Sequence, residues 1–410
     1  MADLRAKLLY TGMILLLFRI GAAIPVPFLK PDILKTYISG DNNWLGYIDL
    51  LSGGAFSNST LFALGISPYI TASIVIQLLA VAIPALEQLA KEGEEGRKIL
   101  NKYTRYCTVA LGLLQSVAYY FLMRNYGALT YTEGPAMYFS AVVIITSFLA
   151  GSMLVMWMGE QIDNKGIGNG ISMILFANII SSIPGMVGTL ATLVWWQIII
   201  VLVGIVALVL FIVFINDAER RIPIQYAKRV VGRKVYGGQN TNLPIKVAMS
   251  GVMPIIFAQS ICSLPATICA FTGKTSGWWY DHVWSSSSWI YAVIYFIMIF
   301  FFSWFYSTIQ YDTVEISNNL KSNGGFIPGF RPGKPTADFI QKVINKIIVF
   351  GSVYLGIVAL LPIIAGNLME GVKNLAIGGT SVIIVVGVAL ETVKALEAQM
   401  LMRHYKGFLD

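Results

Sequence analysis

The sequence has few charged residues for its length. Of its 410 residues, 12% are charged and 56% are hydrophobic, whereas a soluble globular chain carries about 25% charged residues. Water is therefore not its main solvent. Apolar runs of about 20 residues recur along the whole chain, which is the length a helix needs to cross a bilayer. This composition excludes a large soluble domain and predicts a membrane protein with many spans.

Cysteine and histidine are also scarce. Cys107, Cys262 and Cys269 lie in or beside apolar runs, and histidine occurs only as His282 and His404. Such a set offers no disulfide framework, no tetrahedral zinc site and no Cys–His nucleophile pair. We therefore expect neither a metal nor another cofactor, and no enzymatic activity.

The apolar runs predict an all-α membrane protein with ten transmembrane helices. The predicted spans are 8–24, 64–83, 104–123, 137–158, 168–188, 195–215, 247–270, 289–311, 344–365 and 379–398. If these are two sets of five, the second set enters from the opposite face, so a duplication would be an inverted repeat.

Basic residues are distributed unevenly between the two sides of this topology. With the N-terminus in the cytoplasm, 23 of the 29 Lys and Arg residues lie in or beside the loops of one side, and five lie on the other. The positive-inside rule then places both termini in the cytoplasm, together with the long loops 216–246 and 312–343. Arg19 is left as a charge deep within a span.

The segment 41–62 is too polar and too rich in Gly and Ser to cross lipid, yet it leads directly into an apolar span. Two interpretations are open. It is an ordinary external loop, or it re-enters the membrane. Re-entry would imply a cavity, because irregular backbone at membrane depth is tolerated only inside protein or beside water.

Several spans begin with Gly or Pro followed by branched aliphatic residues at helical spacing. These residues are Ile66, Ile70, Ile171, Leu175, Ile256 and Ile384. Facing inward, they would form a hydrophobic constriction that blocks water and ions by dewetting. Facing outward, they would be ordinary lipid-facing or helix-packing side chains.

Polar side chains also occur inside apolar spans, where an unpaired hydrogen-bonding group is costly. They are Thr71, Gln77, Gln115, Gln259 and Ser260. They either join neighbouring helices permanently or form a seam that opens towards lipid. The spacing does not decide between these two roles.

The two long cytoplasmic loops carry more positive charge than orientation requires. The loop 216–246 has seven basic residues against two acidic ones, and the loop 312–343 ends in a tip stiffened by Pro and Gly. Their candidate docking residues are Lys228, Arg229, Arg233, Lys234, Arg331 and Lys334. An acidic protein or ribosomal RNA phosphate would suit them. The alternative is that they serve only topology and lipid headgroups.

Seven motifs give the chain a family resemblance over nearly its full length. They are FRIGAAIPVP (18–27), LSGGAFSNSTLFALGISPYITASIVIQLL (51–79), KEGEEGRK (91–98), GEQIDNKGIGNGIS (159–172), RRIPIQYAKR (220–229), PGFRPGKPT (328–336) and IGGTS (377–381). With these motifs the chain resembles the SecY/SEC61-alpha family, whose bacterial members are the channel-forming subunits of the Sec protein translocon.

That resemblance implies two inverted five-helix halves, 1–190 and 191–410, around a central pore that conducts unfolded secretory chains. The six aliphatic residues would form the pore ring, and the five polar residues would lie at a lateral gate that releases apolar segments into lipid. A plug would lie within 41–62, with Leu51, Ser52, Gly53, Gly54, Ala55 and Phe56 at its centre.

The same resemblance implies partners and a location. The partners are the SecE and SecG subunits, the SecA motor ATPase, the ribosome, substrates with signal sequences, and membrane lipids. The location is the bacterial plasma membrane. The rival interpretation is a secondary transporter for a small solute, which shares inverted repeats and broken helices. Such transporters usually carry ionisable groups at mid-membrane for coupling, and here Arg19 stands alone.

Overall fold

The computed structural model describes residues 2–38, 49, 52–190, 194–226, 229–231, 234–236, 240–248, 251–271, 280–284, 288–310, 312–368 and 373–406. The helices of the first half of the chain are α1 (Ala2–Gly21), α2 (Pro31–Ile38), α4 (Ser67–Ala82), α5 (Pro84–Lys91), α6 (Glu94–Asn125), α7 (Pro135–Lys165) and α8 (Gly170–Leu190). Those of the second half are α9 (Trp195–Asp217), α10 (Met253–Phe271), the π-helix η1 (Tyr280–Trp284), α11 (Trp289–Gln310), α12 (Thr313–Ser322), α13 (Lys334–Leu368) and α14 (Lys373–Lys406).

Each predicted span coincides with a helix, namely α1, α4, α6, α7, α8, α9, α10, α11, α13 and α14. In the described part of the chain, five helices are long and apolar enough to cross a membrane by composition alone. A sixth is added if α4 and α5 count as one bent span, and α8 and α10 contain shorter apolar helices.

The bounds of several helices differ from the predicted spans. Helix α13 begins at Lys334 rather than at 344, because its first turns bury Ile340 and Ile344 in a hydrophobic cluster with the β1–β4 hairpin. Helix α10 begins at Met253 rather than at 247. Gly251 has a positive φ of 60°, which a right-handed helix cannot contain, so the helix starts after it. Hydropathy alone misses both effects, since it detects lipid exposure and not helix ends.

A bend separates α4 from α5. The two helices meet at 103° around Ile83 and Pro84. Proline has no backbone N–H and clashes with the preceding turn, so it ends α4. The helix α5 that follows buries no residue.

The two long loops carry a small sheet that the sequence analysis did not predict. Strands β1 (Glu219–Tyr226) and β4 (Asn240–Lys246) form an antiparallel hairpin in which Glu219 pairs with Lys246 and Gln225 with Asn240. Strand β5 (Gly325–Phe326) joins the other edge of β1 and so connects the two loops. Strands β2 (Arg229–Val231) and β3 (Lys234–Tyr236) pair at the hairpin tip.

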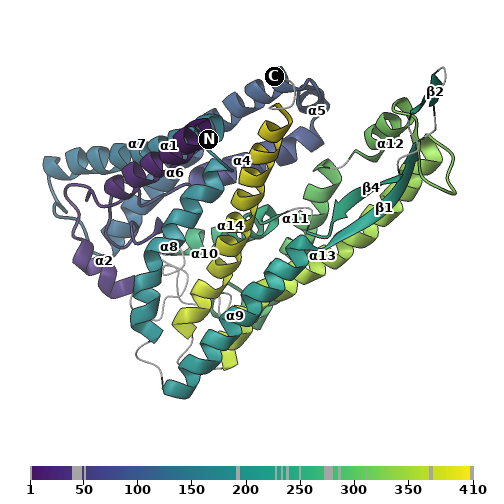
Figure 1. Ribbon diagram of the computed structural model, residues 1–410. Coiled ribbons are helices and arrows are strands. Elements are labelled where there is room, and N and C mark those ends of the chain that lie inside the picture. Colours follow the sequence, from purple (N-terminus) through teal and green to yellow (C-terminus); the bar gives the residue numbers. More distant parts are fainter. Residues whose placement is uncertain are drawn as a thin grey trace.

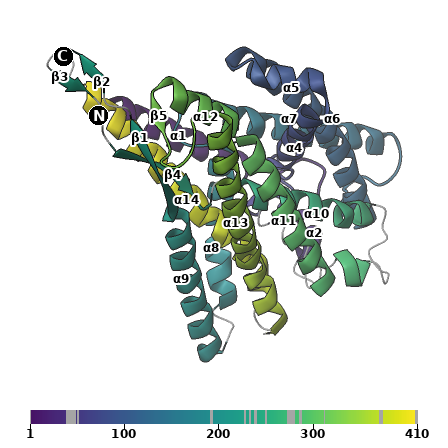
Figure 2. The ribbon, with the colours of Figure 1, turned by 90° about the vertical axis from the view of Figure 1, so that its right-hand side faces the viewer.

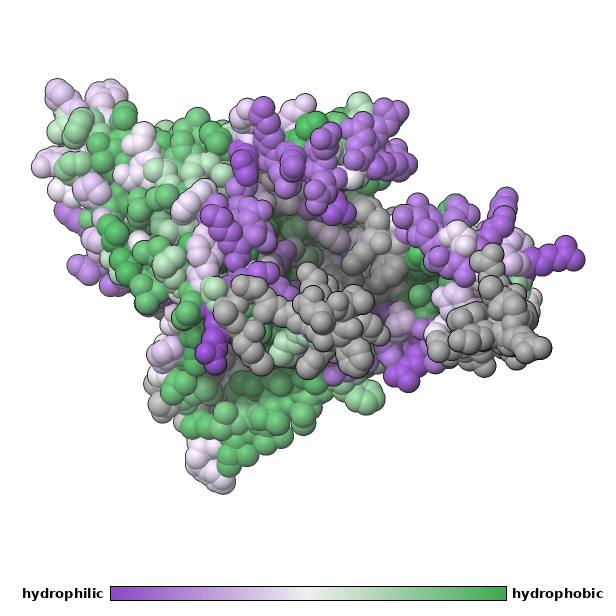
Figure 3. All heavy atoms as spheres, turned by 45° about the horizontal axis from the view of Figure 1, so that its top comes forward, coloured by the Kyte–Doolittle hydropathy of each residue, from purple (hydrophilic) through white to green (hydrophobic). Residues whose placement is uncertain are grey.

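Helices α1, α6 and α7 run in a different direction from α9 and α13 (Figure 1). Helix α1 begins at the end of the molecule where α14 ends, and α5, α12 and β2 lie towards that same end in both ribbon views (Figures 1 and 2). Hydrophilic side chains gather on this end, while apolar side chains cover the flanks below it (Figure 3). This distribution agrees with a membrane-embedded body beneath a polar face.

The largest hydrophobic core joins the two halves of the chain. It contains Ile66 and Leu175 from the first half and Ile256 and Ile384 from the second, all nearly inaccessible to solvent. Side chains that the sequence places more than 300 residues apart therefore meet at one point. Any pore would have to pass through this core.

Candidate functional site

A cavity of about 110 Å³ lies where the two halves meet. Five of the six candidate pore-ring residues line it, and each of the five is at most 5% exposed. These are Ile66, Ile70, Leu175, Ile256 and Ile384. These five side chains are buried and face inward, so they are not lipid-facing. Their role as a pore ring stays a prediction.

Ile171, the sixth candidate, does not line this cavity. It is half-buried and packs against the same core as the other five. It precedes Leu175 by one helical turn, so it shares a face of α8 with a lining residue. Its place in the ring stays a prediction.

Four of the five polar gate candidates line the same cavity: Thr71, Gln115, Gln259 and Ser260. They come from α4, α6 and α10, which contact one another. Thr71 donates to the Ser67 carbonyl oxygen (3.1 Å) and Ser260 to that of Ile256 (2.8 Å), each within its own helix. Both hydroxyl groups therefore bond to a carbonyl oxygen of their own helix and do not join two helices.

The two glutamines Gln77 and Gln259 do connect helices. Gln259 Nε2 donates to the hydroxyl oxygen of Tyr291 on α11 (3.2 Å). Gln77 does not line the cavity, but its Oε1 accepts a hydrogen bond from the Tyr306 hydroxyl of α11. Because α4 and α11 belong to different halves, the second bond crosses the seam. Sequence reasoning missed Tyr306, since a tyrosine in an aromatic-rich span carries no signal of its partner.

Residues 52–60 fold into successive turns against this cavity. Ser52 and Phe56 line it, and Phe56 N donates to Ser52 Oγ (3.0 Å). Tyr119 of α6 donates to the Phe56 carbonyl oxygen (2.9 Å) and meets the Phe56 ring edge-on at 4.8 Å. Buried, internally bonded turns argue against an ordinary external loop for the described part of 41–62. Leu51 lies outside the described residues.

Gly53 explains why the motif needs glycine. It has a positive φ of 66°, and a Cβ there would lie 2.8 Å from Arg19 Nη1, 2.8 Å from Ser181 Oγ and 2.9 Å from Asn178 Oδ1. Gly54 also has a positive φ, of 82°, but a Cβ there would meet only Asn58 Nδ2 at 3.7 Å. The two glycines therefore differ in surroundings and not in backbone type.

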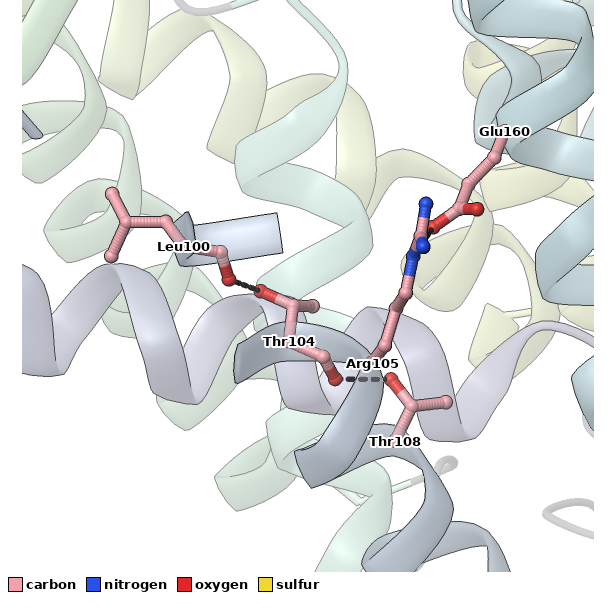
Figure 4. Close-up of polar contacts among 5 residues, drawn as sticks. All are labelled: Leu100, Thr104, Arg105, Thr108 and Glu160. Carbon is pink, nitrogen blue, oxygen red and sulfur yellow. Dashed lines mark hydrogen bonds and ion pairs between the residues drawn. The ribbon is translucent and has the colours of Figure 1, made fainter. Parts of the chain in front are cut away.

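An ion pair joins α6 to α7 near the C-terminal end of α7 (Figure 4). Arg105 Nε lies 2.7 Å from Glu160 Oε1, and the Glu160 side chain is 15% exposed. Thr104 and Thr108 next to it donate to backbone carbonyl oxygens one turn earlier in α6. Glu160 belongs to the motif GEQIDNKGIGNGIS, in which Asp163 Oδ1 also accepts from Gly170 N at 2.7 Å.

The hydrogen bond from Gly170 N to Asp163 fixes where α8 starts, and therefore where Leu175 lies along the helix axis. A carboxylate at a helix N-terminus satisfies a free N–H group and interacts favourably with the helix dipole. Burial raises the pKa of Asp163 above its ordinary value, and the hydrogen bond from Gly170 opposes that rise. Residues 166–169 of the motif form the connection between α7 and α8.

The candidate docking residues are only partly described. Arg331 and Lys334 are exposed on the tip of the second loop. There Thr336 Oγ1 donates to the Arg331 carbonyl oxygen (2.8 Å), and Phe330 stacks on Phe339 at 4.2 Å. Arg229 and Lys234 lie in β2 and β3, whereas Lys228 and Arg233 lie outside the described residues.

Comparison with known proteins shows which family this chain belongs to. The family model described as SecY matches residues 60–393. Protein translocase subunit SecY of Streptomyces galbus is 42% identical over 99% of this chain and 97% of its own length. The SecY subunit of Corynebacterium glutamicum is also 42% identical, over 100% of this chain and 98% of its own length.

Solved structures share the fold at lower identity. A chain described as "The structure of a protein conducting channel" aligns with a TM-score of 0.66 at 20% identity, covering 96% of this chain and 92% of that one. "Sec61 in the Canine ribosome-channel complex from the endoplasmic reticulum" aligns with a TM-score of 0.61 at 18% identity, with the same coverage. The predicted all-helical membrane channel fold is thus confirmed, and the chain belongs to the SecY family of protein translocase subunits.

Proposed function

We propose that this chain is a protein-conducting channel subunit. Unfolded secretory polypeptides would pass through the aliphatic ring, and apolar signal or membrane segments would leave sideways into lipid between α4 and α10. The observation that carries this proposal is the cavity in which ring, gate and plug candidates meet. No coupling ion site is required, so the transporter interpretation is not favoured.

The chemistry of the ring suits this task. Branched aliphatic side chains offer no polar group to retain a passing chain, and a narrow apolar constriction excludes water and ions by dewetting. The described residues of the plug, Ser52 to Phe56, would block the cavity until a substrate displaces them. In this proposal the chain itself hydrolyses nothing, and a partner supplies the energy.

The test is a photo-crosslinking experiment. A photoreactive amino acid replaces Ile256, which lines the cavity, and a secretory chain is stalled midway through export. We expect crosslinks to the stalled chain at Ile256 and none at Val203, which is 63% exposed on α9. Equal crosslinking at the two positions, or none at Ile256, would remove the ring from the translocation path.

We further propose the partners and the location implied by the family. The basic loops would dock the SecA motor or the ribosome, with Arg331 and Lys334 exposed at a rigid tip. SecE and SecG would brace the two halves, 1–190 and 191–410, in the bacterial plasma membrane with both termini cytoplasmic. Phosphate contacts to the loops would weaken steeply with salt.

Charge reversal tests the docking surface. The substitution Arg331→Glu is expected to reduce motor- or ribosome-driven export while the chain still accumulates in the membrane. Asp338→Lys, which reverses an exposed charge in the first turns of α13, is the matched control and is expected to preserve export. Unchanged export in Arg331→Glu would remove Arg331 from the docking site.

A further inference from the structure

Arg19 is the charge that the proposed mechanism has not used. It lies in α1 between the buried Phe18 and the exposed Ile20. Among the described residues, its Nη1 is buried and has no hydrogen-bond partner. A cation at membrane depth is expensive even when it has partners, and an unsatisfied buried donor adds to that cost. A charge retained under these conditions is a functional candidate.

The plug is what covers this charge. The backbone of Gly53 lies so close to Arg19 Nη1 that a Cβ on residue 53 would be 2.8 Å from it. Ser181 and Asn178 of α8 complete the seat, and Asn178 is fully buried. Asn178 follows the ring residue Leu175 by one helical turn, so the seat is adjacent to the ring. Only a residue without a side chain fits there.

We propose that Arg19 is a positioning residue that opposes closure of the plug. The inference rests on the proposed assignment of residues 52–56 to a plug. While Gly53 occupies the seat, the guanidinium group is kept from water on its Nη1 side. When the plug leaves, the group gains water as a partner. The closed state therefore carries a cost that the open state does not, and Arg19 lowers the work needed to open the channel.

This inference and a stabilising contact between Arg19 and the plug predict opposite effects of removing Arg19 on plug opening. If Arg19 held the plug in place, its removal would loosen the plug. If it opposes closure, a neutral side chain of similar length, as in Arg19→Met, must tighten the plug instead. An unsatisfied buried donor costs at least about 1 kcal/mol, which corresponds to about a fivefold change in the open fraction.

Plug opening can be followed by labelling a buried plug residue. Ala55 is 1% exposed, and Ala55→Cys adds one sulfur atom in a chain whose native Cys107, Cys262 and Cys269 are replaced by alanine. A membrane-impermeant maleimide added at the outer face then reports the open fraction of the full-length channel in membrane vesicles. In this background Arg19→Met is expected to slow labelling about fivefold or more. An unchanged or faster rate would overturn the proposal.

The two plug glycines provide a matched pair for the seat. Both have positive φ, so alanine strains the backbone at either position, but only at Gly53 would the new Cβ collide with the seat. Gly53→Ala is therefore expected to speed labelling well beyond Gly54→Ala. Equal rates would show that no seat exists at Gly53.

Two further arms keep the outcomes separable. If Arg19→Met fails to accumulate in membranes, Arg19→Leu, which also removes every donor, is measured in its place with the same expected direction. In the Ala55→Cys channel that keeps Arg19 and Gly53, a stalled secretory chain must speed labelling of Cys at position 55. If it does not, the plug assignment itself fails, and this result is distinct from a failure of the role given to Arg19.

Discussion

Tyr306→Phe is the substitution with the sharpest expected effect on the gate. It removes only the hydroxyl group that donates to Gln77 across the seam between the halves. The ring keeps its contact with Phe257 of α10, at a centroid distance of 5.2 Å. Packing is therefore preserved, and the change isolates one hydrogen bond that the gate would lose on opening if the proposed function holds.

The size of the effect follows from the strength of such bonds. A hydrogen bond contributes about 0.5–1.5 kcal/mol net, and bonds between membrane helices average about 0.6 kcal/mol. Burying one methylene group contributes about 0.8 kcal/mol. Loss of the Tyr306 bond should therefore offset the loss of about one methylene from the apolar segment that opens the gate. A signal sequence weakened by a single Leu→Val change should be exported again.

The assay is export of a reporter with a graded series of signal sequences, and the chain supplies its own control. Tyr291 also lies on α11 and bonds a glutamine, but Gln259 belongs to the same half. Tyr291→Phe should not change the export threshold, which is the least hydrophobic signal sequence that still supports export. In a double-mutant cycle, Tyr306→Phe combined with Gln77→Met should shift the threshold no further than either change alone. Additive shifts, or equal shifts from both tyrosine variants, would refute the reasoning.

Three further predictions concern structure that supports the site. Arg105→Glu or Glu160→Arg alone should lower the thermal stability of the membrane-extracted chain, and the double exchange should recover part of it, because the pair is only partly exposed. No recovery would mean that the pair contributes nothing. Gly151→Ala places a Cβ 1.9 Å from a backbone carbonyl oxygen and should cost about 1–3 kcal/mol, whereas Gly188→Ala, with nothing within 4 Å, should cost nothing measurable. Similar losses at both would refute the close approach. Burial raises the folded-state pKa of Asp163 above 3.8, so its stabilisation is complete below that value and is lost as the pH rises through the raised pKa. Asp163→Asn should flatten this decline in unfolding measured against pH, and an identical pH profile would contradict it.

The spans and the family were readable from the sequence for a simple reason. Lipid imposes a length and a composition on each crossing, and both are local properties of the chain. Motifs such as LSGGAFSNST and GEQIDNKGIGNGIS are likewise contiguous. The Gly and Ser content of residues 41–62 predicted irregular backbone. In the structure residues 52–60 form turns, and Gly53 and Gly54 have positive φ.

What only the tertiary structure decided are the contacts between helices that are distant in sequence. Periodicity gives the face of a helix but not the element that meets it. For that reason Ile66 and Ile384 were candidates until the fold joined them in one cavity, and Tyr306 carried no signal at all. The β-sheet was also hidden, because its hairpin buries Ile222 and Ile245 against α13 and not in lipid. Arg19 stood out in the sequence as a charge in a span, but only the position of Gly53 against it shows what keeps that charge from water.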